Sequence, residues 1–434
     1  MNSSTLNPLL ARDSKVVWHP YGRPCDQASL IPITHGEGAL LFDDSGNPYI
    51  DAISSWWVNL HGHAHPYIAL AIGRQASQVS QAIFGNFTHE PAVRLAERLL
   101  DLLPTNQRCV FYSDNGSTAV EVALKLALHY HQVQGEKQRR RFVYLEGAYH
   151  GDTFGAMAVS DRGVFTAPFF SHLTQATALP FPRVGMEDQV LDAYSSLIQE
   201  RDVAACIIEP RVQGAAGMRI YSDRFLNKLW EMSRENGILV IADEVMTGFG
   251  RTGPLFASLA VKQQPDLICL SKGITGGVLP LGVTTMTESI RRAFHSDELP
   301  RTFYHAHSFT GNALACAAAN ASLDLLARND CIEARQGIAD SHETFLNKLS
   351  SLYPNLPVRR LGTICAIDVP STEETGYSNS LRGKLLAEFL KHRVLLRPLG
   401  NTVYIIPPYC ITQAQLSTVY DVIVDVLAKL PLLE

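Results

Sequence analysis

The sequence lacks long apolar runs and any sign of a targeting segment. None of its 434 residues lies in an uninterrupted apolar stretch of the roughly 18 residues that a membrane-spanning helix needs. Residues 1–13 contain neither the basic opening nor the apolar stretch of a secretory signal. We therefore expect a cytoplasmic protein that has no membrane-spanning segment.

Basic clusters are also scarce. The chain has 37 lysine and arginine residues against 42 aspartate and glutamate residues, a formal charge of −5, and its largest basic cluster is residues 137–141. Proteins that bind nucleic acids usually present a broad basic surface that neutralises phosphates. This composition argues against nucleic acid as a partner and predicts that the short basic run is a solvated loop.

Paired cysteines are absent too. The eight cysteines are scattered along the chain, none belongs to a C-x-x-C motif, and several lie in apolar runs. Cysteines with this distribution are typically reduced and packed in the protein interior. The sequence therefore predicts buried thiols rather than a disulfide framework.

The chain does contain a large apolar fraction, arranged in short runs. Hydrophobic residues make up 46% of the sequence and charged residues 18%, which are the proportions of an ordinary folded protein. A chain of this length exceeds the usual size of one hydrophobic core. We therefore expect a large domain accompanied by a smaller one.

The middle of the chain alternates between strand patterns and helix patterns. Apolar residues recur at helical spacing within residues 116–131 and again within residues 223–235. Strands are expected at residues 108–113, 142–145, 204–208, 238–242, 267–270 and 281–285. This alternation predicts the α/β class, with a mostly parallel central sheet and helices on both of its faces.

The two ends of the chain have a different pattern. Helices are expected at residues 332–349, 380–392 and 412–427, with strands at residues 364–369, 394–397 and 403–406. This is an α+β arrangement. The amino-terminal part, with a strand at residues 39–43, is expected to pack with it. The predicted division is an amino-terminal segment of residues 1–80, a large domain of residues 81–328 and a small domain of residues 329–434.

An acid and an amine end two neighbouring strands. Asp243 closes the apolar run 238–242, and Lys272 closes the run 267–271. Open α/β sheets bind their ligands at the carboxyl ends of the strands, so we expect the two side chains to lie close together. An amine can form a Schiff base with the aldehyde of pyridoxal phosphate, while a carboxylate can hold a proton on its pyridine nitrogen. The pair predicts an enzyme that uses this cofactor.

Residues 113–118, Ser-Asp-Asn-Gly-Ser-Thr, join the first strand of the central sheet to the following helix. The hydroxyl groups and the free backbone amides of the helix N-terminus can bind a phosphate there. A simple turn with an N-capping residue would have nearly the same sequence. The residues alone leave both interpretations open, while the position in the sheet favours phosphate binding.

Residues 248–253 have the spacing G-x-G-x-x-G of a dinucleotide-binding loop. In that motif the glycines follow the strand directly, whereas residues 243–247 intervene here. No acidic residue follows about 20 positions later to bind a ribose. A nicotinamide or flavin dehydrogenase is therefore a disfavoured alternative.

Three histidines, His61, His63 and His65, lie in a segment that is expected to enter a helix at Pro66. No second set of acidic ligands lies near them in the sequence. We therefore expect no metal site here.

Two adjacent tryptophans, Trp56 and Trp57, cannot both point into one core from a regular strand. At least one of them is expected to line a pocket. A tryptophan in the core beside one at a subunit interface fits the sequence nearly as well.

Taken together, the motifs resemble the class III pyridoxal phosphate-dependent aminotransferases of fold type I. The resemblance covers nearly the whole chain. It is carried by Trp18-His19-Pro20-Tyr21, Ser54-Ser55-Trp56-Trp57, His61-Gly62, Gly116-Ser117, residues 149–157, Ile208-Glu209-Pro210, Asp243-Glu244-Val245, residues 248–253, Ser271-Lys272-Gly273, residues 311–323 and Arg397-Pro398. Active sites of this family are shared between two subunits, so the resemblance implies a homodimer.

The resemblance implies roles for four residues around the cofactor ring. Lys272 would bind the cofactor covalently and carry protons during the reaction. Asp243 would pair with the protonated ring nitrogen. Tyr149 would stack on one face of the ring, and Val245 would pack against the other.

The phosphate group would be bound, by the same resemblance, through Gly116 and Ser117. They would be joined by Ser308 of the partner subunit. The family usually has threonine at that position, and serine keeps the hydroxyl group that the role requires.

The resemblance also implies the substrates. Tyr21, Trp56 and Trp57 would offer aromatic faces to S-adenosylmethionine as amino donor. Arg397 would bind the carboxylate of the acceptor, 8-amino-7-oxononanoate, in biotin synthesis. Donor and acceptor would use one site in turn, which gives ping-pong kinetics.

Several alternatives stay open at this point. Within the family, the substrate could be a diamine, γ-aminobutyrate or β-alanine, or lysine could replace S-adenosylmethionine as donor. A noncatalytic pyridoxal-binding protein would be expected to lack Lys272 or Asp243, and both are present.

Overall fold

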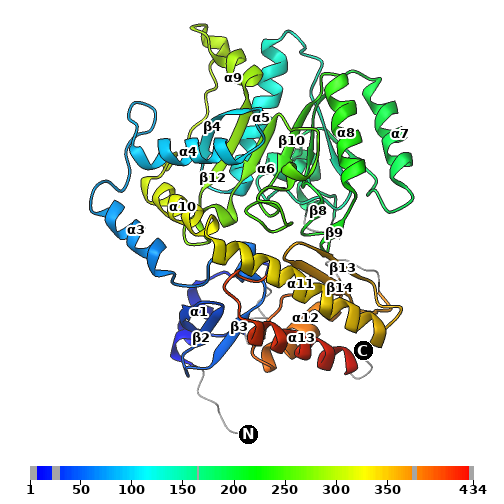
Figure 1. Cartoon of the computed structure of the whole chain (residues 1–434). Coiled ribbons are helices and arrows are strands. Elements are labelled where there is room, and N and C mark those ends of the chain that lie inside the picture. Colours follow the sequence, from blue (N-terminus) through cyan, green and yellow to red (C-terminus); the bar gives the residue numbers. More distant parts are fainter. Residues whose placement is uncertain (1–6, 22–29, 164–165, 374–378, 430–434) are drawn as a thin grey trace.

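The computed structural model describes residues 7–21, 30–163, 166–373 and 379–429 (Figure 1). Within these ranges, no helix is both long enough and apolar enough to cross a membrane. The seven cysteines in these ranges are free thiols, and four of them are buried, as the sequence predicts. Cys25 lies outside the described residues.

A seven-stranded sheet forms the centre of the molecule. Its strand order is β4-β12-β11-β10-β7-β5-β6. The strands are β4 (Gln107–Ser113), β5 (Arg141–Leu145), β6 (Ala176–Leu179), β7 (Val203–Ile208), β10 (Leu239–Asp243), β11 (Leu267–Leu270) and β12 (Gly282–Thr287). All neighbouring strands are parallel except β12, which runs antiparallel to both β11 and β4. The mostly parallel sheet is confirmed.

One strand of this sheet is not predicted by the sequence pattern. β6 lies at the sheet edge, and of its four residues only Leu179 is buried. A short edge strand needs little apolar surface, so it leaves no clear alternation in the sequence.

Helices cover both faces of the central sheet, as predicted. Successive strand residues point to opposite faces. In β5, Val143 belongs to the core formed with α8 (Asp223–Glu235), and Tyr144 belongs to the core formed with α5 (Gly116–Val133). Burying two apolar faces requires a helix layer on each, and Figure 1 shows α7 and α8 beside the sheet.

The two chain ends meet in a second region below the central sheet (Figure 1). β1 (Ile33–Glu37), β2 (Leu40–Asp43) and β3 (Pro48–Asp51) form a sheet that β15 (Val394–Leu395) completes by parallel pairing with β3. β13 (Val358–Leu361), β14 (Ile364–Asp368) and β16 (Thr402–Ile405) form another sheet. The pairing of β3 with β15 supports our proposal that residues 1–80 pack with residues 329–434.

The remaining helices connect these sheets and cover them. They are α1 (Pro8–Val16), α2 (Ser54–Trp57), α3 (Pro66–Ala76), α4 (Glu90–Leu102), α6 (Phe154–Ala158), α7 (Glu187–Ile198), α9 (Glu288–Phe294), α10 (Ala313–Leu326), α11 (Asn329–Leu352), α12 (Leu381–Lys391) and α13 (Gln413–Ala428). The short strands β8 (Val212–Gln213) and β9 (Arg219–Ile220) form a hairpin after β7. The helices that the sequence predicts near residues 332, 380 and 412 are confirmed as α11, α12 and α13.

Candidate active site

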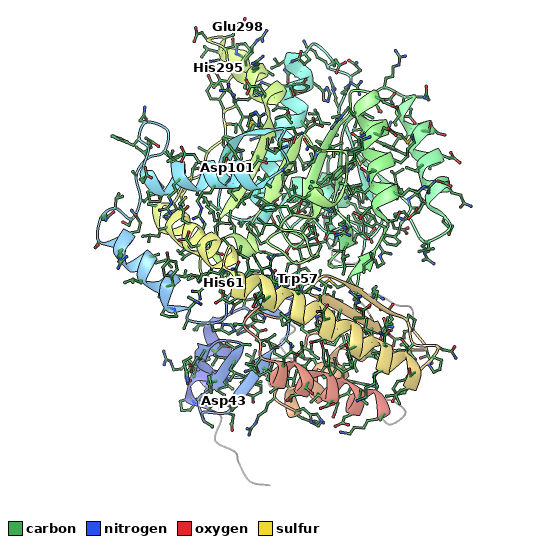
Figure 2. The ribbon with its side chains drawn as sticks, in the orientation of Figure 1. Asp43, Trp57, His61, Asp101, His295 and Glu298 are labelled. Atoms are coloured by element: carbon green, nitrogen blue, oxygen red, sulfur yellow. The ribbon has the colours of Figure 1, made fainter. Side chains whose placement is uncertain are left out.

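A cavity of about 620 Å³ opens at the carboxyl ends of β10 and β11. Its lining includes residues that the sequence analysis proposed for the site, at these strand ends and at the start of α5. These are Gly116, Ser117, Tyr149, Asp243, Val245 and Lys272, together with Trp57. Trp57 lies at the junction between the central sheet and the region of the chain ends (Figure 2). The fold therefore brings most of the predicted site residues to one cavity.

Lys272 lies two residues after the end of β11, in a strained backbone conformation. Its φ angle is 46°, in the left-handed region that few residues other than glycine adopt. Such a conformation costs about 1–3 kcal/mol and occurs mainly at functional sites. The Nζ atom lies 4.5 Å from the centroid of the Trp57 ring. Burial lowers the pKa of Lys272, and Asp243 and Glu209 oppose this change. Burial thus shifts the equilibrium toward the neutral amine, which is the nucleophilic form.

Asp243 is the buried last residue of β10. Its Oδ2 atom accepts a hydrogen bond from Nδ1 of His150 over 2.6 Å. Its Oδ1 atom accepts one from the backbone N–H of Val245 over 3.0 Å. These two bonds fix the orientation of the carboxylate toward the cavity.

His150 is a residue to which the sequence analysis assigned no role. It follows Tyr149 after β5, within the family motif of residues 149–157. Its side chain is buried, and its Nε2 atom has no hydrogen-bond partner among the described residues. The signal in the sequence was its place beside Tyr149, but only the fold shows that it reaches Asp243.

Glu209 is a second buried carboxyl group in the cavity lining, at the end of β7. It accepts hydrogen bonds from the backbone N–H groups of Gly214, over 2.9 Å, and Tyr149, over 3.4 Å. Burial raises the pKa of Glu209 to about 7; His150 opposes this rise, and Asp243 adds to it. In the sequence, Glu209 stands out only as part of the motif Ile208-Glu209-Pro210.

The turn of residues 113–118 forms the start of α5. Asn115 is the N-cap, and its side chain accepts a hydrogen bond from the N–H of Thr118. A Cβ atom on Gly116 would lie 2.8 Å from Cγ1 of Val245. Such a side chain would have to displace Val245, so the close packing requires glycine. The turn is both capped and open to the cavity, which makes it suitable for an anion.

Tyr149 is half-buried at the cavity wall. Burial raises the pKa of its phenol, and the nearby Asp152 adds to the rise. The phenol therefore stays neutral and offers a flat aromatic face with an O–H group at one end.

The two tryptophans diverge, as predicted. The segment α2 is irregular, with φ angles of 53° at Ser54, 58° at Ser55 and 66° at Trp57. Trp57 is buried, and its Nε1–H donates a hydrogen bond to the hydroxyl of Tyr404 over 3.0 Å. Trp56 instead is 43% exposed. An irregular backbone is what sends two consecutive side chains to different environments.

Arg397 lies against the exposed tryptophan. The guanidinium carbon of Arg397 is 4.6 Å from the centroid of the Trp56 ring. The ring of Tyr21 lies 5.9 Å from the same tryptophan, and its hydroxyl donates to Asp152 over 2.8 Å. Among the described residues, no carboxylate forms an ion pair with Arg397. These aromatic faces and this cation are available to a ligand that carries a carboxylate.

Ser308 is the one predicted cofactor residue that the fold does not bring to this cavity. It is exposed, and its backbone carbonyl accepts a hydrogen bond from Nε2 of Gln81 over 3.2 Å. The cavity lining of its own chain does not include it.

The three histidines of the segment 61–65 have separate partners. His61 contacts Ser322, His63 contacts Asp51, and the side chain of His65 caps α3. In the described part of the chain, no group of three histidine, cysteine or acidic side chains could hold a metal ion.

The residues 248–253 do not form a dinucleotide-binding loop. They lie in a series of turns after β10 rather than at a strand-to-helix junction. Arg251 is buried and donates hydrogen bonds to the carbonyl oxygens of Pro407, over 2.7 Å, and Asn59, over 3.2 Å. The segment therefore joins the large sheet to the region of the chain ends.

The cavity residues fit pyridoxal phosphate. Amides and a hydroxyl at the start of α5 suit its phosphate, an amine with a lowered pKa suits its aldehyde, and a fixed carboxylate suits its ring nitrogen. The missing side chain of Gly116 lets Val245 pack directly against the start of α5.

Comparisons with known proteins agree with this geometry. The family model described as "Aminotransferase class-III" matches residues 21–427. An adenosylmethionine-8-amino-7-oxononanoate aminotransferase from Synechococcus elongatus is 46% identical over 95% of this chain and 99% of its own length.

Two solved structures are also similar. The crystal structure of adenosylmethionine-8-amino-7-oxononanoate aminotransferase from Methanocaldococcus jannaschii is 33% identical and superposes with a TM-score of 0.90, covering 97% of this chain and 98% of that one. An amine transaminase from an uncultivated Pseudomonas species, in its pyridoxal phosphate-bound form, is 28% identical with a TM-score of 0.89, covering 95% and 98%. The predicted family, fold class and cofactor are thereby confirmed. The chain belongs to the class III aminotransferases, and it is a pyridoxal phosphate-dependent enzyme.

Proposed function

We propose that this aminotransferase transfers an amino group from S-adenosylmethionine to 8-amino-7-oxononanoate and so forms 7,8-diaminononanoate for biotin synthesis. The observation that carries the proposal is the Arg397 guanidinium, which lies on Trp56 without a carboxylate partner among the described residues. An apolar chain that ends in a carboxylate fits an aromatic wall that ends in a guanidinium. The similar aminotransferases from Synechococcus elongatus and Methanocaldococcus jannaschii, both named for adenosylmethionine and 8-amino-7-oxononanoate, support the same substrates.

The geometry supports the proposed roles at the reactive end of the cofactor. When bound, pyridoxal phosphate supplies an aldehyde that bonds to amines and a ring that withdraws electrons from the adjacent carbon. Lys272 would hold that aldehyde and would carry the proton at the substrate carbon, a role that its lowered pKa supports. Asp243, oriented by His150, holds the proton at the ring nitrogen.

The remaining roles concern binding. Tyr149 and Val245 confine the ring between a flat and a branched surface. Gly116 and Ser117 bind the phosphate at the start of α5.

The donor is proposed to lie against Tyr21, Trp56 and Trp57. Aromatic faces attract a cation such as a sulfonium and also accept an alkyl chain. The contact of Tyr21 with Trp56, at 5.9 Å between ring centroids, supports a shared wall. Both substrates are proposed to bind against the same aromatic residues. The donor product must therefore leave before the acceptor enters, which gives ping-pong kinetics.

We further propose a cytoplasmic homodimer with shared active sites. The exposed position of Ser308, away from the cavity of its own chain, supports a role for Ser308 in the site of a neighbouring copy. A second subunit would also cover apolar side chains such as Tyr304 and Phe309, which are 71% and 60% exposed.

The test is spectroscopic. The cofactor-loaded protein is mixed separately with S-adenosylmethionine, lysine, ornithine and γ-aminobutyrate, and the visible absorption of the lysine-bound cofactor is followed. We expect only S-adenosylmethionine to remove it rapidly, and 8-amino-7-oxononanoate to restore it. Loss of absorption with lysine or γ-aminobutyrate alone would assign the chain to one of the alternative substrates.

A variant tests the role of the lysine in the same assay. Lys272→Ala is expected to lack the visible absorption and all transamination, because no other amine replaces the covalent bond. Full turnover by Lys272→Ala would refute the proposed mechanism.

A further inference from the structure

A chain of four polar side chains runs from the helix that starts at the phosphate turn to the segment that contains Ser308. The phosphate turn is residues 113–118, and the Ser308 segment is residues 302–312. Nζ of Lys125, on α5, lies 2.9 Å from Nδ1 of His305. Nε2 of His305 lies 3.1 Å from Nε2 of His307. Nδ1 of His307 lies 3.3 Å from Oδ2 of Asp114, in the phosphate turn.

The chemistry of the two end groups assigns every proton in this chain. A lysine ammonium can only donate, so Nδ1 of His305 accepts and its proton is on Nε2. That proton is donated to Nε2 of His307, which leaves the proton of His307 on Nδ1. That proton faces the carboxylate of Asp114 at 3.3 Å, which is within ion-pair distance but is not a hydrogen bond. Each ring has a single tautomer that satisfies both of its neighbours.

The chain is complete only while both imidazoles are neutral. A second proton on His305 would point an N–H at the ammonium of Lys125. A second proton on His307 would point an N–H at the N–H of His305. Burial lowers the pKa of His305, and so do Lys125 and His307, while Glu121 on α5 opposes this change. The charged and titratable groups facing the pair are Lys125, Glu121 and Asp114.

Other contacts hold the Ser308 segment in the same place. The backbone N–H of His307 donates to Oγ1 of Thr310 over 2.9 Å. Nε2 of Gln81 donates to the carbonyl oxygens of Ser308, over 3.2 Å, and Thr310, over 3.4 Å. The ring of Phe303 stacks on His305, with centroids 5.7 Å apart. Gln81 thus binds the backbone of the segment at Ser308 and Thr310, while Lys125 and Asp114 contact it through the two histidines.

We propose that His305 and His307 are positioning residues for the cofactor: as a neutral pair they join Lys125 to Asp114 and hold the Ser308 segment beside the phosphate turn, and a second proton on either ring breaks this chain. The inference rests on the proposed phosphate-binding roles of Gly116, Ser117 and Ser308. It does not depend on which substrates the enzyme uses. Its consequence is that cofactor affinity falls in mild acid.

The test measures the affinity of the cofactor-free protein for pyridoxal phosphate, from the visible absorption, at about pH 8 and about pH 5, because the pKa of His305 is lowered from its ordinary value. The variants are His305→Gln, His307→Gln and the double variant. His295→Gln is the control, since His295 is exposed at the outer end of the molecule (Figure 2). The phosphate of the cofactor titrates equally in all proteins, so only differences between variants carry the result.

At about pH 8 each single variant should bind the cofactor about three- to tenfold more weakly, the effect of one lost hydrogen bond. The double variant should be no weaker than the single ones, because one break already opens the chain. On acidification, wild type and His295→Gln should lose their tighter binding of the cofactor, so that their affinity approaches that of the His305 and His307 variants. Two results would overturn the proposal. One is a loss of cofactor affinity in the double variant that equals the sum of the single losses. The other is a ratio of wild-type to variant affinity that is the same at both pH values.

A second variant changes the pH profile without touching either histidine. Lys125 is exposed, so Lys125→Met should fold normally. Removing the ammonium takes away the first link of the chain, so Lys125→Met should already have the weakened cofactor affinity of the single histidine variants at about pH 8 and should lose little more on acidification. Lys137→Met, also exposed, is the matched control and should keep the wild-type profile. If cofactor affinity depended on pH in Lys125→Met as it does in wild type, Lys125 would not be part of the chain. Failure of the substrate proposal would appear in the donor assay alone and would leave these cofactor profiles unchanged.

Discussion

The Nδ1 atom of His150 donates a hydrogen bond to Oδ2 of Asp243 over 2.6 Å, and both side chains are buried. The two residues are distant in sequence, since one follows β5 and the other ends β10. The carboxylate of Asp243 cannot rotate freely, because His150 donates to one of its oxygens and the N–H of Val245 donates to the other. Asp243 therefore presents its free acceptor capacity in one direction only, toward the cavity that Lys272 also lines.

Removing this donor should impair the enzyme. His150→Ala is expected to lower kcat and the affinity for pyridoxal phosphate by about 10- to 100-fold, the equivalent of one hydrogen bond to a charged group. Steady-state kinetics and cofactor titration measure both effects. The exposed residue His295 provides the control, and His295→Ala should match wild type. Wild-type kcat in His150→Ala would show that Asp243 needs no orienting partner.

The guanidinium of Arg397 should matter for one half-reaction only. Arg397→Ala is expected to slow the step with the keto acceptor by about tenfold or more, because its carboxylate loses a charged partner, and to change the donor step little. Arg397→Lys should recover part of the loss, since lysine keeps the charge but not the fork-shaped geometry. Single-turnover absorption measurements separate the two steps. Arg12→Ala, at an exposed site, should affect neither; a donor step that is slowed more than the acceptor step would contradict the assignment.

A methyl group at the phosphate turn should disturb cofactor binding. In Gly116→Ala the new Cβ atom would lie 2.8 Å from Cγ1 of Val245, so the turn or the valine must move. We expect the affinity for pyridoxal phosphate to fall about tenfold or more, measured by titration. Gly73→Ala is the control, because a Cβ atom there meets nothing within 4 Å. Equal affinities of both variants would mean that the turn does not contact the cofactor.

The charge state of Glu209 should make stability depend on pH. Burial raises its pKa from 4.5 to about 7, so the folded protein favours the neutral acid. The stabilisation from this raised pKa is complete below pH 4.5 and is lost as the pH rises through about 7. The melting temperature of cofactor-free Glu209→Gln, relative to wild type, should therefore increase over this interval. Glu97→Gln, on the exposed side of α4, should show no such trend. A constant difference between wild type and Glu209→Gln at all pH values would argue against a buried neutral Glu209.

Much of the fold follows from local patterns. The strands β10 and β11 and the helices α5 and α8 have apolar residues at strand or helix spacing, and these elements lie where the sequence predicts them. The edge strand β6 and the strand β13 are missed because they bury few side chains. Pairing of β3 with β15 joins residues far apart in the chain, and local spacing contains no information about such contacts.

The sequence by itself determined that Asp243 and Lys272 end neighbouring apolar strands, which is enough to predict the cofactor, since strand ends meet at one edge of a parallel sheet. The tertiary structure decided how these groups are tuned. It brought His150 to Asp243, buried Glu209 beside Lys272, and turned Trp56 toward Arg397 while Trp57 entered the core. The physical reason is that strand periodicity is a local property, whereas pKa values and hydrogen-bond partners depend on burial and on groups from distant parts of the chain.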